Sequence, residues 1–76
     1  MPEVPRIKAS EAIGAFLKAG FQQVRKRGSH LILKKEGHRL LLSVPCHRGK
    51  ILGLGLLDSL IDASGLTREE FIALLD

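Results

Sequence analysis

The first regular pattern in the chain is an apolar stripe with the period of a helix. Its members lie three or four positions apart and share one helical face: Ala9, Ala12, Ile13, Phe16 and Leu17. We expect a helix over residues 9–19, because Gly20 suits the left-handed cap that ends many helices. Phe21 would then fold back onto the apolar face of this helix.

After Gly20 the pattern changes to an alternation with a period of two, which is typical of strands. It predicts three short strands, over residues 22–26, 30–35 and 38–44. Turns at 27–29 and 36–37 join them, and Pro45 ends the third strand because proline cannot donate to a β-ladder. Strands joined by turns this short form an antiparallel meander.

The alternation in the second strand assigns its side chains to two faces. Leu31 and Leu33 fall on one side of the strand. His30, Ile32 and Lys34 fall on the other. We expect the two leucines to pack against helices, so His30 and Lys34 should point away from the core.

The last third of the chain returns to helical spacing. A second helix is expected over residues 54–64, ended by Gly65. Thr67 and Glu70 have the spacing of a capping box, which predicts a last short helix over residues 68–75. The order α-β-β-β-α-α predicts an α+β fold, in which helices cover one face of a three-stranded antiparallel sheet and leave the other uncovered.

Length and composition limit the classes of protein to which the chain can belong. Seventy-six residues make a single domain, 1–76, and the lone Cys46 cannot form an internal disulfide. The paired ligand spacings of a structural zinc site are absent, so we expect no metal and no other cofactor. The longest apolar-rich stretch, 51–61, is interrupted and too short for a bilayer, and no export signal opens the chain. We therefore expect a cytoplasmic protein with no membrane partner.

The net charge of +4 conceals an uneven distribution. Residues 1–57 carry eleven Lys and Arg against three Glu, a net charge of +8. Residues 58–76 carry one Arg against five acidic residues, a net charge of −4. Eight basic residues and a single acid lie within residues 25–50. An excess this one-sided is typical of a protein that binds a polyanion.

The tripeptide Gly28-Ser29-His30 contains the best candidate for chemistry. Histidine gives and takes protons near neutral pH, and His30 follows a run of three cations. Gly28 supplies the turn geometry, and Ser29 either orients His30 or caps the turn. His47, in a basic loop, is a second candidate, either as an acid or phosphate ligand or as an ordinary loop residue. His38 is expected at the surface.

A set of landmarks, in order along the chain, resembles one family. They are Ala19-Gly20-Phe21, Gly28-Ser29-His30, Val44-Pro45 with His47, and Ala63-Ser64-Gly65-Leu66-Thr67 running into Glu69-Glu70-Phe71. Together they resemble the HicA toxins of HicA–HicB toxin–antitoxin pairs, over roughly residues 7–75. The resemblance implies a fold similar to a double-stranded-RNA-binding domain.

The resemblance also implies an activity and a partner. It implies an mRNA interferase of a type II toxin–antitoxin system, a small ribonuclease that cleaves mRNA until a HicB-like antitoxin masks it. The family's catalytic histidine corresponds to His30. Family members often have a polar or aromatic residue directly after that histidine, where this chain has Leu31. This difference from the family does not affect His30. It concerns whether a second side chain takes part in the reaction at position 31.

The residues present suit such a reaction without a metal, because the 2′-hydroxyl of RNA is its own nucleophile. The reaction needs a base, an acid and cations around the developing charge, and we predict a 2′,3′-cyclic phosphate product. The candidate phosphate-binding side chains are Arg25, Lys26, Arg27, Lys34 and Lys35 in the meander and Arg48 and Lys50 in the later loop. The three phenylalanines occupy core-like positions, so stacking on bases is not expected.

Two functions of other classes remain open on the sequence. One is a non-catalytic RNA-binding module that uses the same basic face. The other is a protein-interaction domain whose positive charge docks an acidic partner. Cleavage of RNA would support the ribonuclease, and binding without cleavage would support the RNA-binding module. A chain that neither cleaves nor binds RNA would leave the protein-interaction domain.

Overall fold

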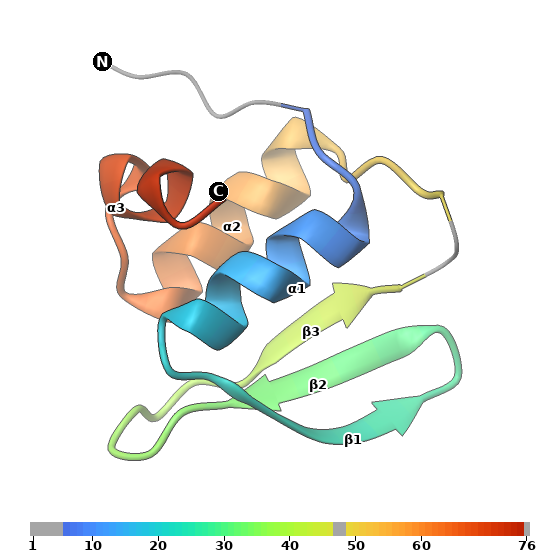
Figure 1. Ribbon diagram of the computed structural model, residues 1–76. Coiled ribbons are helices and arrows are strands. Elements are labelled where there is room, and N and C mark those ends of the chain that lie inside the picture. Colours follow the sequence, from blue (N-terminus) through green and yellow to red (C-terminus); the bar gives the residue numbers. More distant parts are fainter. Residues whose placement is uncertain (1–5, 47–48, 76) are drawn as a thin grey trace.

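The computed structural model of the chain describes residues 6–46 and 49–75. The elements in this part of the chain are, in order, α1 (Ala9–Lys18), β1 (Gln22–Arg27), β2 (His30–Lys34), β3 (Leu42–Pro45), α2 (Leu54–Ser64) and α3 (Arg68–Ala73). Figure 1 shows the helices together on one side of the sheet. The predicted α-β-β-β-α-α order and α+β fold are confirmed, consistent with a double-stranded-RNA-binding-domain-like architecture.

The sheet is antiparallel and has the order β1-β2-β3, so β2 is its central strand. Leu31 and Leu33 on β2 are buried, and their partners on β3, Val44 and Leu42, are fully buried with them. His30, at the start of β2, is exposed. The two faces predicted from the alternation are therefore confirmed.

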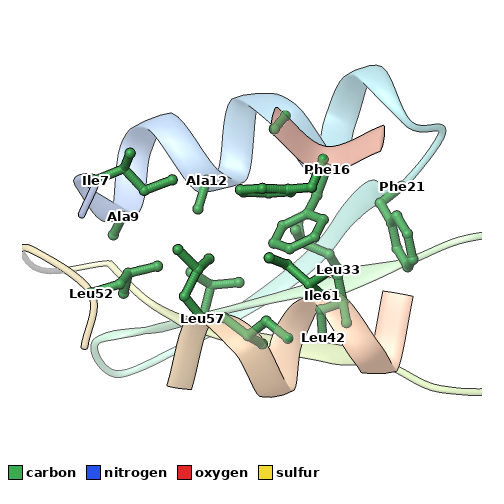
Figure 2. Packing of buried hydrophobic residues seen from close by; sticks show 14 of the residues in the cluster. Ile7, Ala9, Ala12, Phe16, Phe21, Leu33, Leu42, Leu52, Leu57 and Ile61 are labelled. Carbon is green, nitrogen blue, oxygen red and sulfur yellow. The ribbon is translucent and has the colours of Figure 1, made fainter. Parts of the chain in front are cut away.

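The core fills the space between the sheet and the helices (Figure 2). Its centre is a group of three aromatic rings. The ring of Phe16 lies 6.1 Å from that of Phe21 and 5.1 Å from that of Phe71, centroid to centroid. All three phenylalanines are buried, as their positions in the sequence predicted.

Within the described residues, no helix has the length and apolarity that a membrane crossing requires.

The helix ends follow the predicted signals closely. Gly65 has a φ of 81° directly after α2, the left-handed conformation that glycine adopts without strain. The capping box before α3 is present: the Glu70 amide donates to the Thr67 hydroxyl over 3.1 Å, and the Thr67 amide donates to the Glu70 carboxylate over 2.8 Å. An ion pair between Arg68 and Asp58, 2.6 Å long, joins α3 to α2.

The third strand is shorter than predicted, because residues 38–41 leave the sheet. His38 explains the difference. Its Nε2 lies 2.6 Å from the carbonyl oxygen of Ala63 near the end of α2, and its ring meets the Phe21 ring edge-on, with centroids 5.5 Å apart. His38 is half-buried, and a partner on a distant element holds its ring, a contact that apolar alternation cannot reveal.

Candidate nucleic-acid interface

His30 is the first residue of the central strand and lies on the opposite side of that strand from the buried Leu31 and Leu33, on the face turned away from the core. Its cross-strand partners are Arg27 on β1 and Pro45 on β3. Directly opposed residues in an antiparallel sheet point to the same side, with Cβ atoms about 5 Å apart. Arg27 and Pro45 therefore flank the exposed imidazole of His30.

The turn before His30 is fixed by its backbone. Gly28 has a φ of 58°, and a Cβ added there would meet no atom within 4 Å, so the requirement for glycine comes from the backbone conformation. The carbonyl oxygen of Ser29 accepts two hydrogen bonds from Cys46, one from its amide over 2.7 Å and one from its thiol over 3.1 Å. These bonds tie the β1–β2 turn to the end of β3 and set the position of His30.

The register of the sheet determines which candidate cations share a face with His30. Arg25 is paired with Ile32, and Gln22 with Lys34. Because Ile32 and Lys34 lie on the same side of β2 as His30, so do their partners. We call this surface the open face: Gln22, Arg25, Arg27, His30, Ile32, Lys34, Ser43 and Pro45.

Two of the predicted phosphate-binding residues fall outside the open face. Lys26 is paired with Leu31, which is 7% exposed and faces the helices, so Lys26 points to the helical side of the sheet. Lys35 packs against the end of α1, with its Nζ 5.8 Å from the centroid of the Phe21 ring. The structure therefore does not bring Lys26 and Lys35 together with His30.

The remaining candidates lie in the loop between β3 and α2. The carbonyl oxygen of Lys50 accepts a hydrogen bond from the amide of Ala9 over 3.0 Å, which ties Lys50 to the start of α1 in the helical layer. His47 and Arg48 lie outside the described residues. The candidate site that the structure defines thus consists of His30 with Arg25, Arg27 and Lys34.

A β-bulge at Val24 produces this grouping. The pairing shifts between Gln23 and Arg25, so Val24 is an extra residue without a partner on β2 and its side chain is 50% exposed. A regular alternation through β1 would instead place Lys26 on the same side as Gln22, and Arg27 on the opposite side. Nothing in the sequence around Val24 signals the bulge, so the faces of β1 could be assigned only from the structure.

The charge and shape of the open face limit what it can bind. Three cations and one imidazole share the open face, and none of the eight strand residues that define it is Asp or Glu. Such a surface attracts phosphate groups, and the exposed imidazole is available for proton transfer. Within residues 6–46 and 49–75, no group of three or more His, Cys, Asp or Glu side chains is placed to hold a metal ion.

The model of a known protein family matches most of the chain. Residues 9–66 match the family model described as the HicA toxin of bacterial toxin–antitoxin. This range runs from the start of α1 past the end of α2 and includes the whole open face. No curated protein matches the chain.

Proposed function

This chain belongs to the HicA toxin family of bacterial toxin–antitoxin systems, and from that premise we propose that it is an endoribonuclease that cleaves mRNA. The observation that most supports the proposal is the position of His30. Its imidazole is exposed at the start of β2, directly opposite Arg27 and on the same face as Arg25 and Lys34. A proton-transfer group surrounded by phosphate-binding cations is what cleavage of RNA requires.

The proposed reaction is a transphosphorylation within the RNA. The neutral imidazole of His30 takes the proton of the 2′-hydroxyl, whose oxygen attacks the adjacent phosphorus. The bond from phosphorus to the 5′-oxygen breaks, and that oxygen is protonated as it leaves. The products are a 2′,3′-cyclic phosphate and a 5′-hydroxyl end. A positioned acid–base group contributes about 10²–10⁴-fold to such a rate.

The source of the proton for the leaving oxygen is a separate question. His30 itself carries a proton after the first transfer. Ser29 and His47 remain the candidate helpers predicted from the sequence. Ser29 is adjacent to His30, and its carbonyl is fixed by Cys46.

The cations suggest how the toxin is silenced. A toxin of this family acts with an antitoxin, and we propose that a HicB-like antitoxin covers the open face with acidic side chains. Complementary charge favours fast and specific association with such a face. Addition of the antitoxin should stop RNA cleavage, and an antitoxin complex that still cleaves RNA at the free rate would contradict a masked site.

The end groups of the product test the proposed reaction. The purified chain is incubated with RNA in EDTA, and the fragments are analysed for their termini. We expect 2′,3′-cyclic phosphate and 5′-hydroxyl ends. Fragments with only 5′-phosphate ends would overturn the transphosphorylation. Tight binding of intact RNA without cleavage would instead support a non-catalytic RNA-binding module, which the three cations of the open face also suit.

A further inference from the structure

We propose that Arg27 is a second catalytic residue, which binds the phosphate undergoing reaction while His30 takes its proton from the neighbouring hydroxyl. The inference rests on the proposed ribonuclease function and on the cross-strand pair between Arg27 and His30. The sequence alone offers five candidate phosphate-binding cations in the meander with no means of ranking them. The sheet register separates them.

Arg27 and His30 are neighbours on the open face. Directly opposed residues place their Cβ atoms about 5 Å apart on one face, so the guanidinium of Arg27 and the imidazole of His30 can reach a single phosphate group. On the other side, His30 is opposed by Pro45, whose side chain has no donor. Within the described residues, Arg27 is therefore the one cation directly opposite His30.

The guanidinium of Arg27 suits the charge that develops during the proposed reaction. When the 2′-oxygen attacks, phosphorus becomes five-coordinate and negative charge builds on its non-bridging oxygens. A guanidinium donates two parallel N–H bonds to two such oxygens, a geometry that an ammonium group cannot reproduce. Charge that develops only in the transition state is stabilised by donors already in position, so the interaction should increase kcat.

The sheet register distinguishes Arg27 from its two basic neighbours. Arg25 is opposed by Ile32, so it lies diagonal to His30 and farther from it than Arg27. We assign it to an adjacent phosphate of the RNA, where it adds affinity. Lys26 is on the other side of the sheet from His30. Adjacent residues of like charge thus have three different expected roles.

The test compares neutral variants of these three residues in a steady-state RNA cleavage assay. Arg27→Ala should lower kcat by about 10²–10³-fold, the usual loss when one transition-state donor is removed. Arg25→Ala should mainly raise KM. Lys26→Ala is the matched control, because it removes the same charge from the adjacent position and should leave both constants within a few-fold. Arg27→Lys should recover only part of kcat, because it restores the charge without the guanidinium geometry.

The outcomes separate this inference from the proposed function. All of β1 is exposed, so the thermal unfolding midpoint should be the same for every variant. A parent chain that cleaves RNA, with Arg27→Ala and Lys26→Ala equally affected, would overturn the role of Arg27 alone. An Arg27→Ala variant altered only in KM would do the same. A parent chain that does not cleave RNA would overturn the proposed function and this inference together.

Discussion

The two histidines that the structure describes, His30 and His38, illustrate how surroundings determine the role of a residue. The His38 ring is held by the Ala63 carbonyl and by the edge of Phe21. The His30 ring is exposed beside Arg27. One histidine joins a loop to a helix, and the other is available to a ligand. Substitution of each should therefore affect a different measurement.

His38→Ala should lower the free energy of unfolding by about 1–3 kcal/mol, because it leaves the Ala63 carbonyl without its partner in a partly buried place. Urea unfolding measures this loss. Under conditions where the variant is folded, its rate of RNA cleavage should remain close to that of the parent. Unchanged stability would show that the 2.6 Å hydrogen bond contributes nothing net.

Two glycines should respond to alanine with opposite signs. Gly28→Ala should cost about 1–2 kcal/mol, because its φ of 58° is strained for any residue with a Cβ. Gly14→Ala is the control: it lies within α1, a Cβ there meets nothing within 4 Å, and the change should stabilise the protein by about 0.5–1 kcal/mol. Thermal unfolding compares them, and a stabilising Gly28→Ala would contradict the turn geometry.

At the scale of elements, α3 depends on its N-terminal cap. The helix spans only Arg68–Ala73, yet it places Phe71 against Phe16 in the core. The side-chain hydrogen bond from Arg68 to Asp58 and the opposite charge of Asp58 raise the pKa of Arg68, and this ion pair joins α3 to α2. A short helix of this kind is marginal alone and needs such support.

Thr67→Ala should destabilise the protein by about 1 kcal/mol, because it removes the acceptor of the Glu70 amide. Thr67→Asp keeps an acceptor at the cap and should stay close to the parent. Denaturant unfolding of the two variants provides the measurement. Equal losses in both variants would show that the cap is not what Thr67 contributes.

The sequence predicts those elements whose ends have a local signal. Gly65 predicted the end of α2 and the capping box predicted the start of α3, because these signals act within a few residues. The start of β3 was missed because His38 is held by Ala63, 25 positions away. The position of His30 on the open face could be predicted, whereas the separation of Arg27 from Lys26 depends on the bulge at Val24 and could not.

At the scale of the whole molecule, part of the positive charge lies on one surface of the sheet. Arg25, Arg27 and Lys34 share the open face with His30, and the five acidic residues of the last third follow the sheet in sequence. The excess charge that the sequence shows is thus partly gathered on a single surface. RNA should therefore bind from one side, with an affinity that falls steeply with salt.

The salt dependence of RNA binding measures how many phosphates the open face contacts. For His30→Ala, which should bind without cleaving, we expect log K to fall against log salt with a slope of about −2 if three cations each contact one phosphate. Lys34→Ala in that background should reduce the slope by about 0.7, and Lys26→Ala should leave it unchanged. Equal changes for both lysines would contradict a one-sided interface.

The central claim is that His30 performs the chemistry, and the rate of RNA cleavage in EDTA by the parent and by His30→Ala tests it most directly. Both proteins are purified in the same way, so that a contaminating nuclease would be common to both. We expect His30→Ala to lose at least about 100-fold in rate, with an unchanged unfolding midpoint because the side chain is exposed. A folded His30→Ala protein that cleaves RNA at the parental rate would contradict it.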